Sequence, residues 1–147
     1  MDIKDILAPN GIKRAIGCSS KKRILELLSL LAADVSDEID SEEVLTSLLS
    51  RERMGSTGIG HGIALPHGRL PGLLKPIALI ITCQDGIEFD AIDNQPVDIF
   101  FAILVPENDT TDHLKILSAI ANKLNDRDIV RKLRKAESEQ ALYEALV

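Results

Sequence analysis

The sequence contains few aromatic residues and has a formal net charge that disfavours nucleic acid. Only 3% of its 147 residues are aromatic, tryptophan is absent, and the net charge is −6. Proteins that stack nucleobases depend on aromatic side chains, and an acidic chain is repelled by a phosphate backbone. We therefore expect no nucleic-acid partner.

Long hydrophobic runs are also missing. The longest apolar run, 77–82, is far too short to span a membrane, and the N-terminus lacks the basic and then apolar pattern of a secretory signal. We expect a cytoplasmic protein without membrane insertion. The two cysteines, Cys18 and Cys83, form no C-x-x-C pair and lie in apolar stretches. Reduced core thiols are the favoured interpretation, and a structural disulfide is the alternative.

The apolar residues that are present predict a layered α/β fold. A hydrophobic content of 45% suffices for one core, and we expect one domain over 1–147. Two nearly continuous apolar runs, 77–83 and 97–105, are typical of strands buried on both faces, which need helices on each side. The sequence thus predicts a three-layer α/β/α sandwich with a mixed β-sheet.

The remaining elements follow from periodicity and capping residues. We expect helices over about 21–33, from the Asp40 cap to about 53, and over 113–124 after a cap at Thr111 or Asp112. Shorter helices are expected after caps at Asp126 and Ser138. Weaker patterns predict a helical turn within 1–9, a turn at 9–11, strands over 11–18 and 87–89, and a loop over 68–76.

Glycine and histidine are concentrated in residues 58–68, which hold four glycines, one proline and two of the three histidines. Glycine permits positive φ or close backbone approach, and Pro66 restricts the chain around it. His67 follows Pro66 after the apolar residues 63–65. We expect it to leave the end of a strand, where ligand sites form in α/β proteins.

His67 is a candidate for nucleophilic phosphoryl transfer. Neutral imidazole is a good nucleophile near neutral pH and forms covalent intermediates. The phosphorylated ring needs hydrogen-bond donors, which glycine-rich backbone, hydroxyl groups and a guanidinium can supply. The candidate donors lie just before or within the glycine run: Arg51, Ser56, Thr57, Gly58 and Gly60.

The other two histidines have two interpretations each. We interpret His61 as a solvated loop side chain, with a second imidazole in the pocket of His67 as the alternative. His113, in the first turn of its helix, is favoured in the neutral form by the helix dipole. It is either a hydrogen-bonded structural histidine or a partner of His67.

The spacing of the histidines and glycines does not match known metal-binding or nucleotide-binding motifs. Three histidines could bind zinc, but the sequence has neither H-x-x-x-H nor H-E-x-x-H. Neither G-x-G-x-x-G nor G-x-x-x-x-G-K-[ST] is present. We therefore expect no metal and no cofactor.

Residues 51–68, from Arg51-Glu52-Arg53 to Pro66-His67-Gly68, resemble the active-site motif of a known family. It comprises the enzyme IIA components of the fructose/mannitol class of the bacterial phosphoenolpyruvate:sugar phosphotransferase system. Residues 19–23, 89–98 and 113–114 are also similar, so the resemblance covers nearly the whole chain. Within the class, the sequence most resembles the nitrogen-regulatory branch.

The resemblance implies a role for each matched residue. His67 matches the histidine that accepts a phosphoryl group on Nε2 from an HPr-like phosphocarrier. His113 matches the second active-site histidine, and Arg51 an arginine beside it. The implied fold is an α/β/α sandwich. Position 61 is usually asparagine in this family, so His61 departs from the pattern, as does Leu65, which replaces isoleucine.

The resemblance also implies two possible uses of the phosphoryl group. The nitrogen-regulatory branch acts in the cytoplasm and controls partner proteins, including potassium transport components, through its phosphorylation state. The alternative is a sugar-specific enzyme IIA that passes phosphate to a permease IIB.

Overall fold

The computed structural model describes residues 2–108 and 112–147, with only the backbone of Asp112. The predicted helical turn within 1–9 is a short helix, and after it come, in the predicted order, one strand, two helices, several strands and three helices. Their bounds are α1 (Ile3–Ile6), β1 (Leu7–Ile16), α2 (Lys21–Val35), α3 (Ser41–Arg53), β2 (Gly58–Gly60), β3 (Ile63–Ala64), β4 (His67–Leu70), β5 (Ile77–Ile87), β6 (Val97–Pro106), α4 (Asp112–Leu124), α5 (Arg127–Lys135) and α6 (Glu139–Leu146).

The six strands form one mixed sheet, as predicted. The strand order is β1-β5-β6-β3-β2, and β4 also pairs with β6. β1 is parallel to β5, and β3 and β4 are parallel to β6, whereas β5–β6 and β2–β3 are antiparallel. The short strands β3 and β4 therefore follow one another along the same side of β6.

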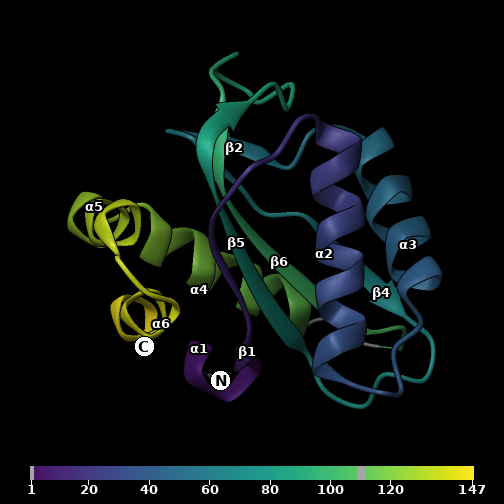
Figure 1. The fold of residues 1–147 in the computed structure, drawn as a ribbon. Helices are drawn as coiled ribbons and strands as arrows, with labels where there is room; N and C mark the ends of the chain where they lie inside the picture. The colour runs from purple at the N-terminus through teal and green to yellow at the C-terminus, as the bar shows by residue number, and fades with distance from the viewer. Residues whose placement is uncertain (1, 109–111) are drawn as a thin grey trace.

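The sheet lies between two helical layers (Figure 1), which confirms the three-layer α/β/α sandwich. Successive side chains of β5 and β6 point to opposite faces. Those that pack under α2 and α3 include Leu79, Ile81, Phe100, Ala102 and Leu104. Those that pack under α1, α4, α5 and α6 include Ala78, Ile80, Phe101, Ile103 and Val105. Each of the two central strands thus contributes to both cores.

Capping residues begin the helices where the sequence predicts them. The caps are Ser20, which accepts from Arg23 N at 3.1 Å, Asp40 from Glu42 N at 3.2 Å, Asp126 from Asp128 N at 2.9 Å and Ser138 from Ala141 N at 3.0 Å. The candidate cap Thr111 lies outside the described residues, and α4 already includes Asp112.

Three predicted boundaries differ from the structure. β1 begins at Leu7 and passes through Pro9 with a break in register before Ile12, because an edge strand tolerates a proline. The predicted separate strand 87–89 is wrong, since β5 continues to Ile87, which pairs with Val97. The predicted loop 68–76 starts three residues too early, because β4 occupies His67–Leu70.

The prediction of two reduced thiols is wrong. Cys18 and Cys83 form a disulfide with their Cα atoms 6.2 Å apart. Cys83 lies opposite Ile16 in the parallel β1–β5 pair, and Cys18 follows two residues later. Adjacent strands thus bring together two cysteines that are 65 positions apart in sequence.

No helix within residues 2–108 and 112–147 has both the length and the apolar composition needed to span a membrane.

Candidate active site

His67 is the first residue of β4, and not, as predicted, the residue that leaves a strand end. β3 pairs Ile63 with Ile99, and β4 pairs His67 with Ile103. Between them, Pro66 accepts a hydrogen bond from Ile103 N at 3.0 Å but has no N–H to donate. The proline therefore interrupts the ladder, and pairing with β6 resumes at His67.

Hydrogen bonds fix the tautomer of the His67 ring. Nδ1 lies 2.9 Å from the carbonyl oxygen of Leu65, which can only accept, so Nδ1 carries the proton. Nε2 then has a lone pair, which accepts from Arg51 Nε at 3.2 Å. The ring nitrogen with nucleophilic character is therefore Nε2.

The surroundings of His67 favour its neutral form. Burial is the main cause that lowers its pKa below the usual 6.5, and the hydrogen bond to Leu65 opposes this effect. The positive charge of Arg51 and the nearby His113 lower the pKa further. A ring with a lowered pKa keeps its Nε2 lone pair at neutral pH.

Close packing of α3 against β4 places Arg51 beside His67. A Cβ at Gly68 would collide with the side chain of Ser47, so the absence of a side chain there allows the helix to approach. Ser47 Oγ donates to the carbonyl oxygen of Arg69 at 3.0 Å and ties the two elements together. Arg51 is one turn further along the helix, and its Nη1 donates to Gly55 O at 2.8 Å.

The first turn of α4 brings His113 to the same pocket. Its Nε2 and Nδ1 lie 3.4 and 3.5 Å from Arg69 Nη2. Arg69 follows His67 by two residues in β4, so both side chains project from the same face of the strand. The pocket has a volume of about 370 Å³. Its lining includes Arg51, His67, Arg69 and His113, together with Ser47, Ser50, Met54, Gly68, Ile103, Val105 and Leu117.

Arg69 is a site residue that sequence reasoning missed. The signal was present, because a residue two positions after the nucleophile in a strand faces the same way. This signal can be used only once His67 is known to begin a strand. With Arg69, two guanidinium groups and two imidazoles converge on one pocket.

The predicted donors of the glycine run do not line this pocket. Ser56 Oγ donates to Phe89 O at 2.9 Å and accepts from Gly58 N at 3.0 Å. Thr57 Oγ1 donates to Glu52 at 2.6 Å. Gly58 packs against Ala91, where a Cβ would collide. Gly60 lies beside Asp93. In this geometry the four residues shape the loop, and we do not include them in the candidate site.

A buried ion pair, which sequence reasoning also missed, holds the glycine run to the helices. Glu52 is 9% exposed, and its carboxylate accepts from Thr57 N at 3.1 Å and from Thr57 Oγ1. Lys21 Nζ lies 2.8 Å from the same carboxylate and 4.7 Å from the ring centre of Phe89. The network links α2, α3 and the start of β2 immediately beside Arg51.

His61 lies outside the pocket of His67, so the alternative of a second imidazole there is not supported. Its side chain is exposed, as the favoured interpretation expects. Its φ is +57°, a left-handed conformation in which asparagine, aspartate and histidine are enriched. Its N–H donates to Asp93 Oδ2 at 3.1 Å. A hydrogen bond from Gln95 N and, to a smaller extent, this bond from His61 N lower the pKa of Asp93.

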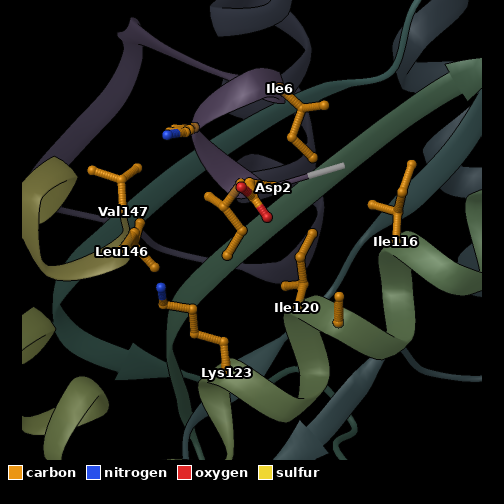
Figure 2. Close-up of a pocket in the computed structure, with 10 residues that line it drawn as sticks. Asp2, Ile6, Ile116, Ile120, Lys123, Leu146 and Val147 are labelled. Carbon is orange, nitrogen blue, oxygen red and sulfur yellow. The ribbon is translucent and has the colours of Figure 1, made fainter.

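The described residues contain no cluster of three histidine, cysteine or acidic side chains that could hold a metal ion. A different pocket, of about 360 Å³, lies between α1, α4 and the end of α6 (Figure 2). Its lining combines the apolar side chains of Ile6, Ile116 and Ile120 with the charged side chains of Asp2 and Lys123, all labelled in Figure 2. Because it contains no histidine, it does not coincide with the predicted site.

Comparison with known proteins agrees with the resemblance in sequence and with the fold. Residues 5–147 match the family model described as "Phosphoenolpyruvate-dependent sugar phosphotransferase system, EIIA 2". A nitrogen regulatory protein of Klebsiella oxytoca is 44% identical over 147 residues, which cover 99% of this chain and 90% of that protein. A fructose-specific EIIA component of Haloferax volcanii is 38% identical over 128 residues, covering 87% of this chain and 83% of that protein. The crystal structure of nitrogen regulatory protein IIA-Ntr from Neisseria meningitidis superposes with a TM-score of 0.91 at 36% identity, covering 99% of both chains.

Proposed function

The chain belongs to the EIIA 2 family of the phosphoenolpyruvate-dependent sugar phosphotransferase system, and from this membership we propose that it is a phosphohistidine carrier. It accepts a phosphoryl group on His67 Nε2 from an HPr-like phosphocarrier protein. The observation that supports this assignment best is the hydrogen bond from Nδ1 to the Leu65 carbonyl. It leaves the lone pair on the nitrogen that faces Arg51.

The transfer step needs no proton acceptor. The Nε2 lone pair of His67 attacks phosphorus, the new N–P bond forms, and the donor imidazole leaves with the electron pair of the N–P bond that breaks. The Nδ1 proton stays in its hydrogen bond to Leu65. The ring therefore keeps one orientation before and after transfer.

Two guanidinium groups stabilise the transferred charge. Arg51 Nε caps the Nε2 lone pair in the unphosphorylated protein, so it moves aside and donates to phosphoryl oxygens when the donor arrives. Arg69, on the same face of β4 as His67, donates from the other side with His113 beside it. Phosphoryl transfer depends mainly on such positioning and charge stabilisation.

Exposed apolar side chains next to the pocket suit a protein donor. Met54, which lines the pocket, is 82% exposed, and Leu114, next to His113, is 60% exposed. Methionine and arginine are both enriched in protein contact surfaces, and here Met54 lies in the same pocket lining as Arg51 and Arg69. The phosphocarrier docks on this surface.

Phosphorylation in a reconstituted system tests the assignment. The protein is incubated with phosphoenolpyruvate, the first phosphotransferase enzyme and an HPr-like carrier, and its intact mass is measured. We expect a gain of one phosphate that is labile in acid and stable in alkali. His67→Gln abolishes it, His113→Gln slows it, and His61→Gln serves as the matched control that leaves it unchanged. Labelling of His67→Gln at the wild-type rate would disprove the assignment.

We further propose that the phosphorylation state regulates partner proteins in the cytoplasm, among them potassium transport components. The similarity to nitrogen regulatory proteins along nearly the whole chain supports this use. Affinity capture with phosphorylated protein and with His67→Gln protein tests it. A regulated partner is retained by one form and not by the other.

A second candidate is a sugar-specific enzyme IIA that passes phosphate to a permease IIB. The similarity to a fructose-specific EIIA component favours it. Adding a purified fructose-type IIB domain to the phosphorylated protein separates the two candidates. Rapid loss of phosphate from His67 to IIB supports sugar transport, whereas retention supports the regulatory role.

A further inference from the structure

Helix α5 concentrates positive charge that the phosphoryl-transfer site does not use. Its nine residues contain five basic side chains and one acidic side chain, a net charge of +4, in a chain whose total is −6. Arg127, Arg131 and Lys135 are spaced four residues apart and therefore lie on one face. With Arg134 and His61 they line a pocket of about 650 Å³.

Interactions within α5 do not fully offset the repulsion between these three positive charges. Lys135 is in the last turn, where a cation is favourable, but Arg127 is the first residue, where the helix dipole opposes it. Like charges four residues apart also destabilise a helix. Asp128 pairs with Arg131. Over the described stretches of the chain, no ion pair involves Arg127 or Lys135. An anion in the pocket would remove this repulsion.

Arg134 lines the pocket, and hydrogen bonds hold its guanidinium group in place. Its Nε donates to Asp98 Oδ2 at 3.1 Å, and its Nη2 donates to Asp98 Oδ1 at 3.0 Å and to His61 O at 2.6 Å. A Cβ at Gly62 would collide with this guanidinium. Asp98 is therefore bound to Arg134, and its charge does not neutralise the row formed by Arg127, Arg131 and Lys135.

The pocket has the chemistry of a phosphate site with an organic neighbour. A guanidinium group can donate two parallel hydrogen bonds to two oxygens of one phosphate. Three of the residues that line the pocket are arginines. Eight residues of helix span roughly 12 Å, more than a single phosphate can contact. Leu124 and Val130, both buried, form an apolar floor beside them. The volume lies within the range of small-molecule sites.

We propose that this pocket binds a small molecule that carries at least two linked phosphate groups. Arg127, Arg131 and Lys135 contact the phosphates, and Leu124 and Val130 are available to an attached organic group. Inorganic pyrophosphate and a nucleoside diphosphate share this chemistry. They differ in the organic group, which only the nucleoside diphosphate can place against Leu124 and Val130.

The pocket is separate from the site of His67. The two pockets share no lining residue. Ile63 and His67 lie opposite Ile99 and Ile103, so the turn at His61 and the start of β4 are four or more residues apart along β6. That spacing corresponds to at least roughly 13 Å. Variants at one pocket therefore leave the other intact.

Calorimetric titration of the full chain with sodium pyrophosphate and, separately, with ADP tests the proposal. We expect saturable one-to-one binding that weakens as salt is added. The double variant Arg127→Gln/Arg131→Gln weakens it by about tenfold or more. Lys135→Gln, which leaves the first turn of α5 unchanged, gives a smaller loss and protects the test if the double variant unfolds.

Two control variants assign the binding to α5. Arg53→Gln removes an exposed arginine elsewhere, and Arg51→Gln removes the guanidinium beside His67. Both keep the wild-type affinity if the proposal is correct. A loss with Arg51→Gln that equals the loss with the double variant would overturn it, because the phosphates would then occupy the phosphoryl-transfer pocket.

The relative affinities identify the ligand class. Tighter binding of ADP than of pyrophosphate supports a nucleotide-like ligand on the apolar floor, and equal binding supports the phosphate chain alone. Absence of saturable binding by both probes at physiological ionic strength would overturn the proposal. So would binding of a glutamate-rich peptide without binding of either phosphate compound, since α5 would then be a surface for an acidic protein.

Discussion

The carboxylate of Glu52 is the group whose removal tests the structure around the site most directly. It accepts from Thr57 N and Thr57 Oγ1 and pairs with Lys21 Nζ at 2.8 Å. In Glu52→Ala, both donors of Thr57, a buried residue, lose their acceptor at a cost of about 1–3 kcal/mol each. Lys21, 25% exposed, regains water and adds little. We expect a loss of about 3 kcal/mol in the free energy of unfolding.

Glu52→Gln separates the charge from the hydrogen bonds. The amide oxygen remains an acceptor for Thr57, so we expect a smaller loss of about 1–2 kcal/mol. Urea unfolding followed by circular dichroism measures both variants. The same variants should accept a phosphoryl group more slowly, because Glu52 holds the loop that follows Arg51. Glu43→Ala, at an exposed glutamate in the first turn of the same helix, is the matched control; it loses a favourable interaction with the helix dipole and should cost no more than about 1 kcal/mol.

A double-mutant cycle with Thr57→Val shows whether the two residues act together. If the network exists as described, the cost of the double variant is smaller than the sum of the single costs by about 1 kcal/mol or more. Additive costs, or a Glu52→Ala protein as stable as the Glu43→Ala control, would refute the inference that this carboxylate fixes the loop.

Three further perturbations probe the packing, the proton and the disulfide. Gly68→Ala presses a methyl group against Ser47, so we expect the free energy of unfolding in urea to fall by about 1–3 kcal/mol and the phosphoryl labelling of His67 to become slower. The double variant Gly68→Ala/Ser47→Gly should recover part of both losses. An unchanged labelling rate in Gly68→Ala would contradict the close approach of α3. Because the pKa of His67 is below 6.5 in the folded protein, labelling in rapid-mixing experiments should hold its rate through pH 6.5 and decline only at lower pH. Compared with His67→Gln, the wild type should lose stability as pH falls below 6.5, since the unfolded chain then binds a proton that the folded ring does not; equal pH profiles would exclude the lowered pKa. Reduction of the Cys18–Cys83 disulfide, which joins residues 65 positions apart, should lower the free energy of unfolding by about 4 kcal/mol on the chain-entropy scale, and Cys83→Ser protein should not respond to reductant.

Sequence patterns predicted the elements that have strong local signals. The apolar runs of β5 and β6 and the caps at Ser20 and Ser138 are local features, and each is confirmed. β4 was missed because His67-Gly68-Arg69-Leu70 has no strand pattern of its own. Its extended conformation comes from pairing with β6, which is a property of the whole sheet.

Only those site residues that stand out in the sequence by their type or their neighbours could be predicted. His67 and Arg51 stand out in the sequence, and the structure brings them into hydrogen-bonding distance. Arg69 and Glu52 look like ordinary charged residues of a loop and a helix. Their positions depend on which strand β4 joins and on which helix Lys21 faces. The disulfide depends in the same way on the register between β1 and β5.

The glycines of the central stretch have a different role from the expected cradle for phosphate. Gly68 lets α3 approach β4, and Gly62 leaves room for the guanidinium of Arg134 from α5. In both places the missing side chain admits an element that carries an arginine, Arg51 in one case and Arg134 in the other. In the proposed transfer, the phosphoryl charge is stabilised by the guanidinium groups of Arg51 and Arg69, which helix and strand packing hold beside His67. Gly62 and Gly68 instead set how closely Arg134 and α3 approach the sheet.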